Sequence, residues 1–122
     1  MYQRMNRTWL AIALALSALL LAVHLYALAN FWYWHYRWFD IPMHILGGIA
    51  IGSLLLSFGT NRRTSIYFLC MLAIVVCWEI FEYVFGISTH QPHYWVDTFK
   101  DMADGLLGSC AALYFARKTA WH

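Results

Sequence analysis

The sequence predicts an all-α polytopic membrane protein that folds as a bundle of four transmembrane helices. Hydrophobic residues make up 62% of the 122-residue chain and charged residues only 11%, a balance far from that of a water-soluble domain. The apolar residues fall into four runs, each long enough at about 1.5 Å per residue to cross a hydrocarbon core about 30 Å thick. Since a bilayer offers the backbone no water to bond, we expect these runs to be helices.

The expected spans cover residues 8–29, 41–58, 65–86 and 101–117, and together they form one transmembrane domain over residues 1–122. The first run follows arginines and ends in small residues, as a secretory signal does. Its apolar core is about twice the length of a signal's, so we interpret it as a retained span. The three cysteines all lie within spans, and their odd number predicts no disulfide framework.

Basic residues predict the orientation of the chain. Only Arg37 and Lys100 fall on one side of the expected spans. The other six of the eight fall on the side of the termini and the second loop: Arg4, Arg7, Arg62, Arg63, Arg117 and Lys118. Because cytoplasmic loops carry the excess of positive charge, we expect a multi-pass protein of the inner or plasma membrane with both termini inside. Topology thus accounts for the few basic residues, and we expect no nucleic-acid partner.

The loop between the first two spans, residues 31–39, is rich in aromatic side chains. Trp and Tyr suit the headgroup level of a bilayer, because the ring can keep one polar edge in water. We interpret this loop as an interfacial aromatic belt, with a ligand-binding aromatic cage as the alternative.

All six acidic residues lie in or beside the outer ends of the expected spans. On antiparallel helices they reach a similar depth, within about 10 Å of the outer interface. Spacings of three and four residues place each group on one face of its helix. The groups are Asp40 with His44, Glu79 with Glu82, and Asp97 with Asp101 and Asp104.

A carboxylate at bilayer depth costs about a few kcal/mol and usually faces the bundle interior or a wet cavity. Several carboxylates in one cavity cannot all stay ionised unless a cation lies among them. Carboxylate oxygens with one or two imidazoles suit Mg, Mn, Ca, Zn or non-haem Fe. The sequence therefore predicts a divalent-metal site with ligands drawn from His44, Glu79, Glu82, Asp97, Asp101, Asp104 and Asp40.

Three neighbouring features bear on this prediction. Asp40 and Asp97 also suit the start of a helix, as caps or as partners of its dipole, and this alternative stays open. Glu79 and Glu82 lie far from a helix start, so a cap role does not apply to them. For Lys100, which directly precedes Asp101, we expect a side chain that points off the acidic face and is a poor partner for the acids.

Small residues predict where two spans touch. Gly48 and Gly52 have the small-xxx-small spacing that lets helices approach closely, and Gly105 and Gly108 follow the last acids. We expect the second and fourth spans to meet just beneath the acidic residues.

Three segments, "DIPMHILGG", "WEIFEY" and "DTFKDMADGLLGS", resemble in their order the pattern of the VanZ-like and YjdF-like families of small membrane proteins. In those families an Asp and a His precede a Gly-rich helical turn, a WExxE-type element follows, and spaced aspartates end in Gly. The resemblance covers roughly residues 40–109, and this chain departs from it by placing Asp104 three residues after Asp101. It implies an integral membrane protein, and VanZ-like members are associated with glycopeptide-antibiotic resistance at the cell envelope.

These features favour a metal-dependent membrane enzyme, a hydrolase or transferase acting at the outer face on a lipid or lipid-linked envelope substrate. A bound cation would polarise a phosphoryl or carbonyl oxygen or activate water. The catalytic candidates are His44, Glu79 and Asp101, with His44 or a spare carboxylate as general base.

Two other classes of protein stay open. The first is a proton- or cation-binding carrier, which four short spans could form only as a homo-oligomer. The second is a structural subunit whose acids pair with a basic helix of a partner. A transport path needs polar residues in both halves of the membrane, and the inner half offers little beyond Ser17, Ser53, Ser57 and Ser109. A one-sided site in the lipid bilayer is therefore favoured over a conduit.

Overall fold

A computed structural model describes residues 5–59, 63–87 and 92–119 of the chain. All of its regular structure in these ranges is helical, so the predicted all-α class is confirmed there. The elements are α1 (Arg7–Ala29), α2 (Trp32–His35), the 3-10 helix η1 (Arg37–Phe39), α3 (Asp40–Ser57), α4 (Thr64–Val84) and α5 (Tyr94–Thr119). Arg4 and Arg62, two of the basic residues used to predict the orientation, lie outside the described residues.

Within the described residues, three helical segments are long and apolar enough to cross a membrane: α1, Arg37–Ser57 and α4. Helix α5 is the longest, at 26 residues, yet its first half is too polar to join them. It begins at Tyr94, well before the expected start near residue 101, because residues 94–100 join the helix although Asp97, Thr98 and Lys100 interrupt their apolar side chains. The chain is thus a helical protein with three candidate membrane spans.

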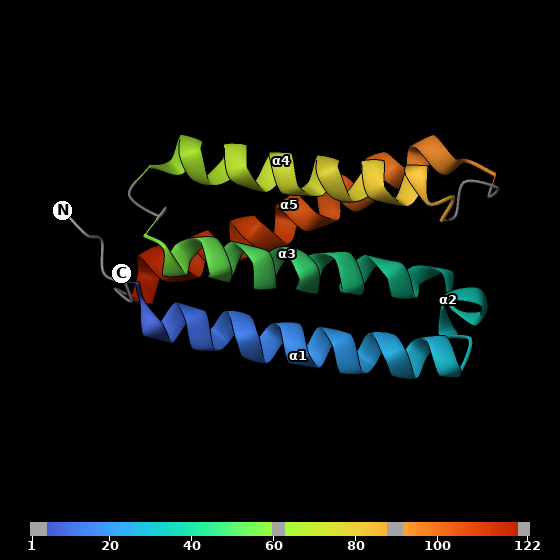
Figure 1. The fold of residues 1–122 in the computed structure, drawn as a ribbon, viewed down its shortest axis with the longest axis horizontal. Helices are drawn as coiled ribbons and strands as arrows, with labels where there is room; N and C mark the ends of the chain where they lie inside the picture. Colours follow the sequence, from blue (N-terminus) through green and yellow to red (C-terminus); the bar gives the residue numbers. More distant parts are fainter. Residues whose placement is uncertain (1–4, 60–62, 88–91, 120–122) are drawn as a thin grey trace.

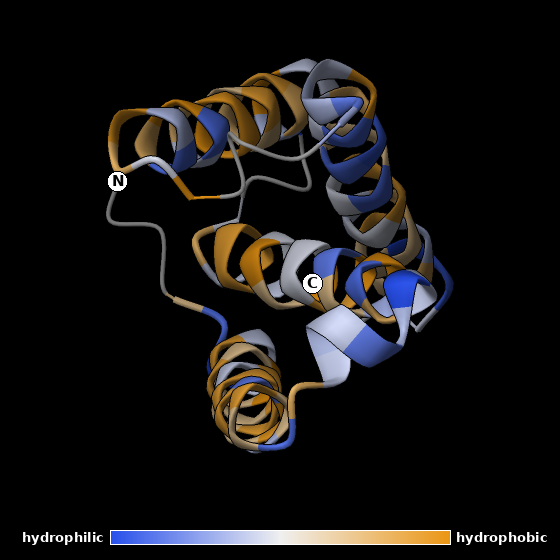
Figure 2. Cartoon of the chain, turned by 90° about the vertical axis from the view of Figure 1, so that its right-hand side faces the viewer, coloured by the Kyte–Doolittle hydropathy of each residue, from blue (hydrophilic) through white to orange (hydrophobic). Residues whose placement is uncertain are grey.

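Helix α3 lies at the centre of the arrangement. It packs against α1 on one side and α5 on the other, while α4 packs mainly on α5 (Figure 1). Seen along the helix axes, α1 and α4 lie on opposite sides of α3 (Figure 2). The middle of the fold is therefore the contact between α3 and α5.

The two ends of the bundle differ in charge. One end holds the start of α1, the end of α3, the start of α4 and the end of α5 (Figure 1). We call it the basic end, since its described charged residues are Arg7, Arg63, Arg117 and Lys118. The other end, which holds α2 and η1, is called the acidic end because all six acids lie toward it: Asp40, Glu79, Glu82, Asp97, Asp101 and Asp104.

Glycines let α3 and α5 meet backbone to backbone. A Cβ atom at Gly48 would collide with the carbonyl group of Gly105, and one at Gly108 would collide with the carbonyl group of Ile45. The predicted contact between these two segments is confirmed. It holds the first turns of α3 beside the acid-bearing half of α5.

An apolar core fills the half of the bundle nearest the basic end, which we call the basic half; the other half is the acidic half. Its buried members are Trp9, Leu56, Tyr67, Met71, Val75, Ala112, Leu113 and Ala116. Tyr67 joins α4 to α5, because its hydroxyl donates to the Ser109 carbonyl oxygen at 2.8 Å. This half anchors the helices from which the acidic side chains project.

The aromatic segment before α3 forms α2 and η1. The Trp32 ring packs edge-on against Tyr26, Tyr36 and Phe39, with centroids 5.3 to 6.2 Å apart. Helix α3 follows η1 directly, so Phe39 occupies the N-cap position and makes no side-chain cap bond. The cap interpretation of Asp40 is therefore wrong, although its charge still lies in the first turn, where the helix dipole favours it.

Asp97 is likewise no cap. It lies in the first turn of α5, three residues after Tyr94, rather than before the helix. Its position still suits the helix dipole.

Candidate functional site

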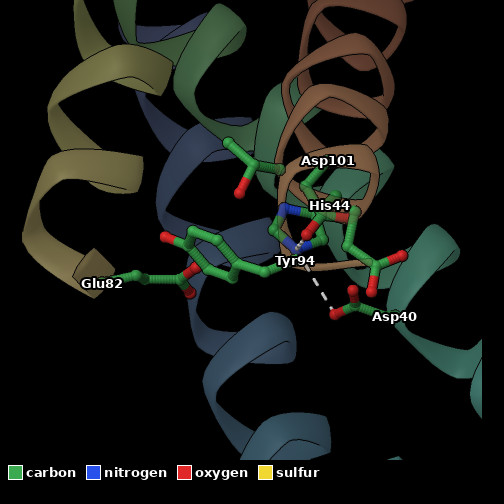
Figure 3. Close-up of a pocket in the computed structure, with 7 residues that line it drawn as sticks. Asp40, His44, Glu82, Tyr94 and Asp101 are labelled. Carbon is green, nitrogen blue, oxygen red and sulfur yellow. Dashed lines mark ion pairs between the residues drawn. The ribbon is translucent and has the colours of Figure 1, made fainter. Parts of the chain in front are cut away.

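Three ligand-type side chains meet at the acidic end. Asp40 and His44 lie one turn apart on α3, and Asp101 faces them from α5 (Figure 3). The His44 Nε2 atom is 3.3 Å from Asp40 Oδ1 and 3.5 Å from Asp101 Oδ2. One ligand atom from each residue lies within 4.8 Å of the others. Small rotations would bring all three to one cation, since metal–ligand bonds are about 2.0–2.6 Å long.

These three residues form one wall of a polar pocket of about 80 Å³. The pocket is lined by Asp40, His44, Glu82, Tyr94, Asp97, Thr98 and Asp101, so that α3, α4 and α5 all contribute (Figure 3). At about 10–15 Å³ per water, the space suits roughly five waters or a partly hydrated ion. Four of its seven lining residues carry carboxyl groups, which favours a cationic occupant.

Lys100 supplies a positive charge from within the chain. Its Nζ atom lies 2.7 Å from Asp101 Oδ1, 3.8 Å from Asp40 Oδ2 and 3.7 Å from Asp104 Oδ2. The expectation that Lys100 points away from the acids is wrong, because its long flexible stem lets the ammonium group reach back over the helix surface. Any external cation must therefore share or displace this ammonium group.

Asp104 lies one turn after Lys100 on α5 and pairs with it. Its Oδ2 atom is buried and has no hydrogen-bond partner among the described residues, and Lys100 Nζ is its ion-pair partner at 3.7 Å. Because a buried carboxylate oxygen without a donor is costly, this atom fits surroundings that contain a cation.

Glu79 and Glu82 share α4 but reach different surroundings. Glu82 lines the polar pocket and accepts a hydrogen bond from Trp78 Nε1 at 3.0 Å. Glu79 is buried and lines a second, apolar groove together with Thr98. Among the described residues, neither belongs to the compact group of Asp40, His44 and Asp101.

The structure thus separates the predicted ligands into four sets. Ligand atoms of Asp40, His44 and Asp101 lie within 4.8 Å of one another, Glu82 and Asp97 line the same pocket, Asp104 pairs with Lys100, and Glu79 lines the groove.

Sequence reasoning missed Tyr94 and Thr98 at this site, and it placed Lys100 away from the acids. Tyr94 and Thr98 line the pocket with Asp101, and the three follow each other at spacings of four and three on α5. If the helix had been expected to begin at Tyr94, this spacing would have placed Tyr94 and Thr98 on the same face as Asp101.

A tyrosine of the aromatic segment bonds to a histidine of α1 near the site. Tyr33 Oη lies 2.7 Å from His24 Nδ1, and the Tyr33 ring packs edge-on against Phe39. Burial, together with the nearby charge of Asp40, raises the pKa of Tyr33 to about 12. Tyr33 therefore stays a neutral phenol at ordinary pH, and it ties the start of α3 to α1.

The sequence matches no protein-family model, and comparisons with curated proteins and with solved structures give no match. The resemblance to the VanZ-like and YjdF-like families therefore stays a prediction. Function has to be inferred from the grouping of side chains at the acidic end.

Proposed function

We propose that the chain is an outward-facing membrane enzyme that binds a divalent cation between Asp40, His44 and Asp101. The observation that carries this proposal is that ligand atoms of these three residues lie within 4.8 Å of one another. Two carboxylates and one imidazole from facing helices form a donor set that suits Mn, Zn or non-haem Fe. Helix bundles hold metals in this way elsewhere.

The same proposal includes four membrane spans with both termini in the cytoplasm. Helix α5 has 26 residues, a length of about 39 Å at about 1.5 Å per residue, which is enough to cross a bilayer. Its last turn carries Arg117 and Lys118, at the same end as Arg7 and Arg63. If this basic end is cytoplasmic, the acidic end and its pocket face outward.

The substrate we propose is a lipid or lipid-linked molecule of the envelope, attacked at a phosphoryl or carbonyl group. A bound cation would supply Lewis acidity at that group. Glu82, which lines the same pocket as His44, would accept a proton from water or a hydroxyl. Lys100 is partly exposed and would turn toward an anionic headgroup once a cation neutralises the acids. The reaction class is hydrolysis or transfer.

A carrier or simple cation-binding protein is the main alternative. Ser53, Ser57 and Ser109 are fully buried, and their hydroxyls donate to carbonyl groups of their own helices. The basic half therefore supports a one-sided site better than a path through the membrane. A structural subunit that pairs its acids with a basic partner would bind no metal.

Metal analysis of the purified protein in detergent tests the proposal. After loading with Mn²⁺ and desalting, we expect about one ion per chain, lost in Asp101→Asn because that variant removes a ligand. Glu79→Gln is the matched control, since it removes a buried carboxylate outside the compact group and is expected to keep the metal. Wild-type protein that binds no divalent cation, or equal loss in both variants, would contradict the assignment.

A further inference from the structure

A second cavity, of about 220 Å³, lies between α4 and α5 at the acidic end. Apolar atoms form nearly all of its surface, and it is lined by Val76, Glu79, Ile80, Tyr83, Tyr94, Trp95, Thr98 and Met102. We call it the α4–α5 groove. It is smaller than the roughly 300–1,000 Å³ of most ligand pockets, so it suits one slender apolar segment rather than a whole ligand.

The groove adjoins the polar pocket. Tyr94 and Thr98 line both of them. In Figure 3 the Tyr94 side chain is drawn among the residues of the polar pocket, on the side of Glu82. An occupant of both spaces would be apolar along the groove and polar at the end that passes Tyr94 and Thr98.

The shape of the groove also restricts its occupant. Its α4 residues recur along one face from Val76 to Tyr83, which is about 10 Å of helix, and its α5 residues run from Tyr94 to Met102. The groove therefore extends along the helices from the acidic end toward the apolar middle of the bundle. Tyr83 stacks on Trp95 near the outer end, with ring centroids 6.3 Å apart. A water-soluble metabolite has no apolar length to match this path.

We infer that the α4–α5 groove holds one hydrocarbon chain of a membrane lipid phosphate whose headgroup lies in the polar pocket. The inference rests on the proposed function for the headgroup, because carboxylates repel a phosphate unless a cation lies between them. The hydrocarbon chain of the lipid needs no cation, since apolar contacts alone hold it in the groove. The lipid would enter sideways from the bilayer, because α4 and α5 expose this side to it.

Photocrosslinking tests this inference. The full-length protein is placed in phosphatidylcholine vesicles with Mn²⁺ and a trace of phosphatidic acid that carries a diazirine on its acyl chain. Crosslinked residues are then mapped by mass spectrometry. We expect them to concentrate on Val76, Ile80 and Met102 over the exposed Leu69 and Leu107, which lie outside the groove. Even labelling of all lipid-facing residues would overturn the inference that the groove holds a lipid chain.

A pair of variants adds a matched control. Ile80 and Val84 are 56% and 69% exposed and lie one turn apart on α4, but only Ile80 lines the groove. Ile80→Trp fills the groove and is expected to lower crosslinking at Met102 about five-fold, whereas Val84→Trp leaves it within about two-fold. Circular dichroism checks that both variants are folded. An equal effect of the two variants would overturn the inference.

Chelation separates this inference from the proposed function. EDTA is expected to lower labelling by the phosphatidic acid probe but not by a neutral diacylglycerol probe with the same diazirine chain. If both probes label the groove and Mn²⁺ has no effect, the result would support a lipid chain in the groove and contradict the proposed metal site. If Mn²⁺ binds but all lipid-facing residues are labelled evenly, the result would contradict lipid binding in the groove and leave the metal site standing.

Discussion

The basic and acidic halves of the bundle satisfy their buried polar groups with different kinds of partner. In the basic half, the hydroxyls of Ser53, Ser57 and Ser109 donate to carbonyl groups of their own helices at 2.6 to 2.8 Å. In the acidic half, His44 and Lys100 bond to carboxylates, and His44 does so across the α3–α5 boundary. A hydroxyl can be satisfied inside one helix, but a carboxylate needs a positive partner. We therefore place function in the acidic half, whose carboxylates need positive partners.

Both halves depend on the same backbone contact. Gly48 and Gly105 bring α3 and α5 together between the serine-bearing turns and the acidic turns. A substitution at this contact should therefore disrupt both halves, whereas a substitution on either side of it should affect one half alone.

The largest expected effect comes from Gly48→Leu. The new side chain would collide with the carbonyl group of Gly105, so the helices must separate, at a cost of about 3 kcal/mol or more. We expect loss of both metal binding and cooperative unfolding, measured by circular dichroism during denaturation in detergent. Gly47→Ala is the control, since its Cβ would meet only Leu20 Cδ2 at an ordinary 3.8 Å. Native stability of Gly48→Leu would show that the two helices need no close contact.

Lys100→Met changes the acidic half alone. It removes the ammonium group that contacts Asp40, Asp101 and Asp104, so an external cation no longer competes with it. We expect Mn²⁺ to bind about ten-fold more tightly, as measured by isothermal titration calorimetry, because about 1.4 kcal/mol of competition is relieved. Lys100→Arg keeps the charge and should change affinity little. Weaker binding in Lys100→Met would mean that Lys100 supports the site instead of competing for it.

A smaller effect is expected where the aromatic segment supports the acidic half. Tyr33→Phe removes the hydroxyl that bonds His24, which should lower the free energy of unfolding by about 1 kcal/mol. Mn²⁺ affinity should stay within about three-fold, since neither residue is a ligand. Thermal denaturation with calorimetric titration measures both. A loss of metal with unchanged stability would place Tyr33 in the site itself.

The smallest effect is expected in the basic half. Ser53→Ala removes a hydroxyl whose recorded bond is to Ile49 of its own helix, so we expect a change in the free energy of unfolding below about 1 kcal/mol. Metal affinity should not change. A fall in both quantities would show that the two halves are coupled and would weaken the comparison.

The sequence predicted the helices best where apolar length alone defines them. The first expected span, residues 8–29, differs from α1 (Arg7–Ala29) by one residue at its start. Helix α5 was expected to start too late, because an apolar window cannot detect first turns in which Asp97, Thr98 and Lys100 interrupt the apolar residues. Length thus predicts a span but not the part of a helix that lies outside the lipid.

The candidate site was predictable within each helix and less so between helices. A spacing of four residues placed Asp40 and His44 on one face, and their contact follows from it. Which acids meet across helices depends on the rotation of each helix, and this separates Glu79 from Glu82. The position of Lys100 depends on side-chain rotamers that spacing does not define.

The central claim is that one cation lies between Asp40, His44 and Asp101, and pulsed electron paramagnetic resonance of bound Mn²⁺ tests it most directly. We expect a nitrogen coupling from a single coordinated imidazole in the wild-type protein, which disappears in His44→Gln and persists in His24→Gln, whose histidine lies on α1 outside the compact group. A Mn²⁺ signal without nitrogen coupling, or a coupling that survives His44→Gln, would contradict the claim.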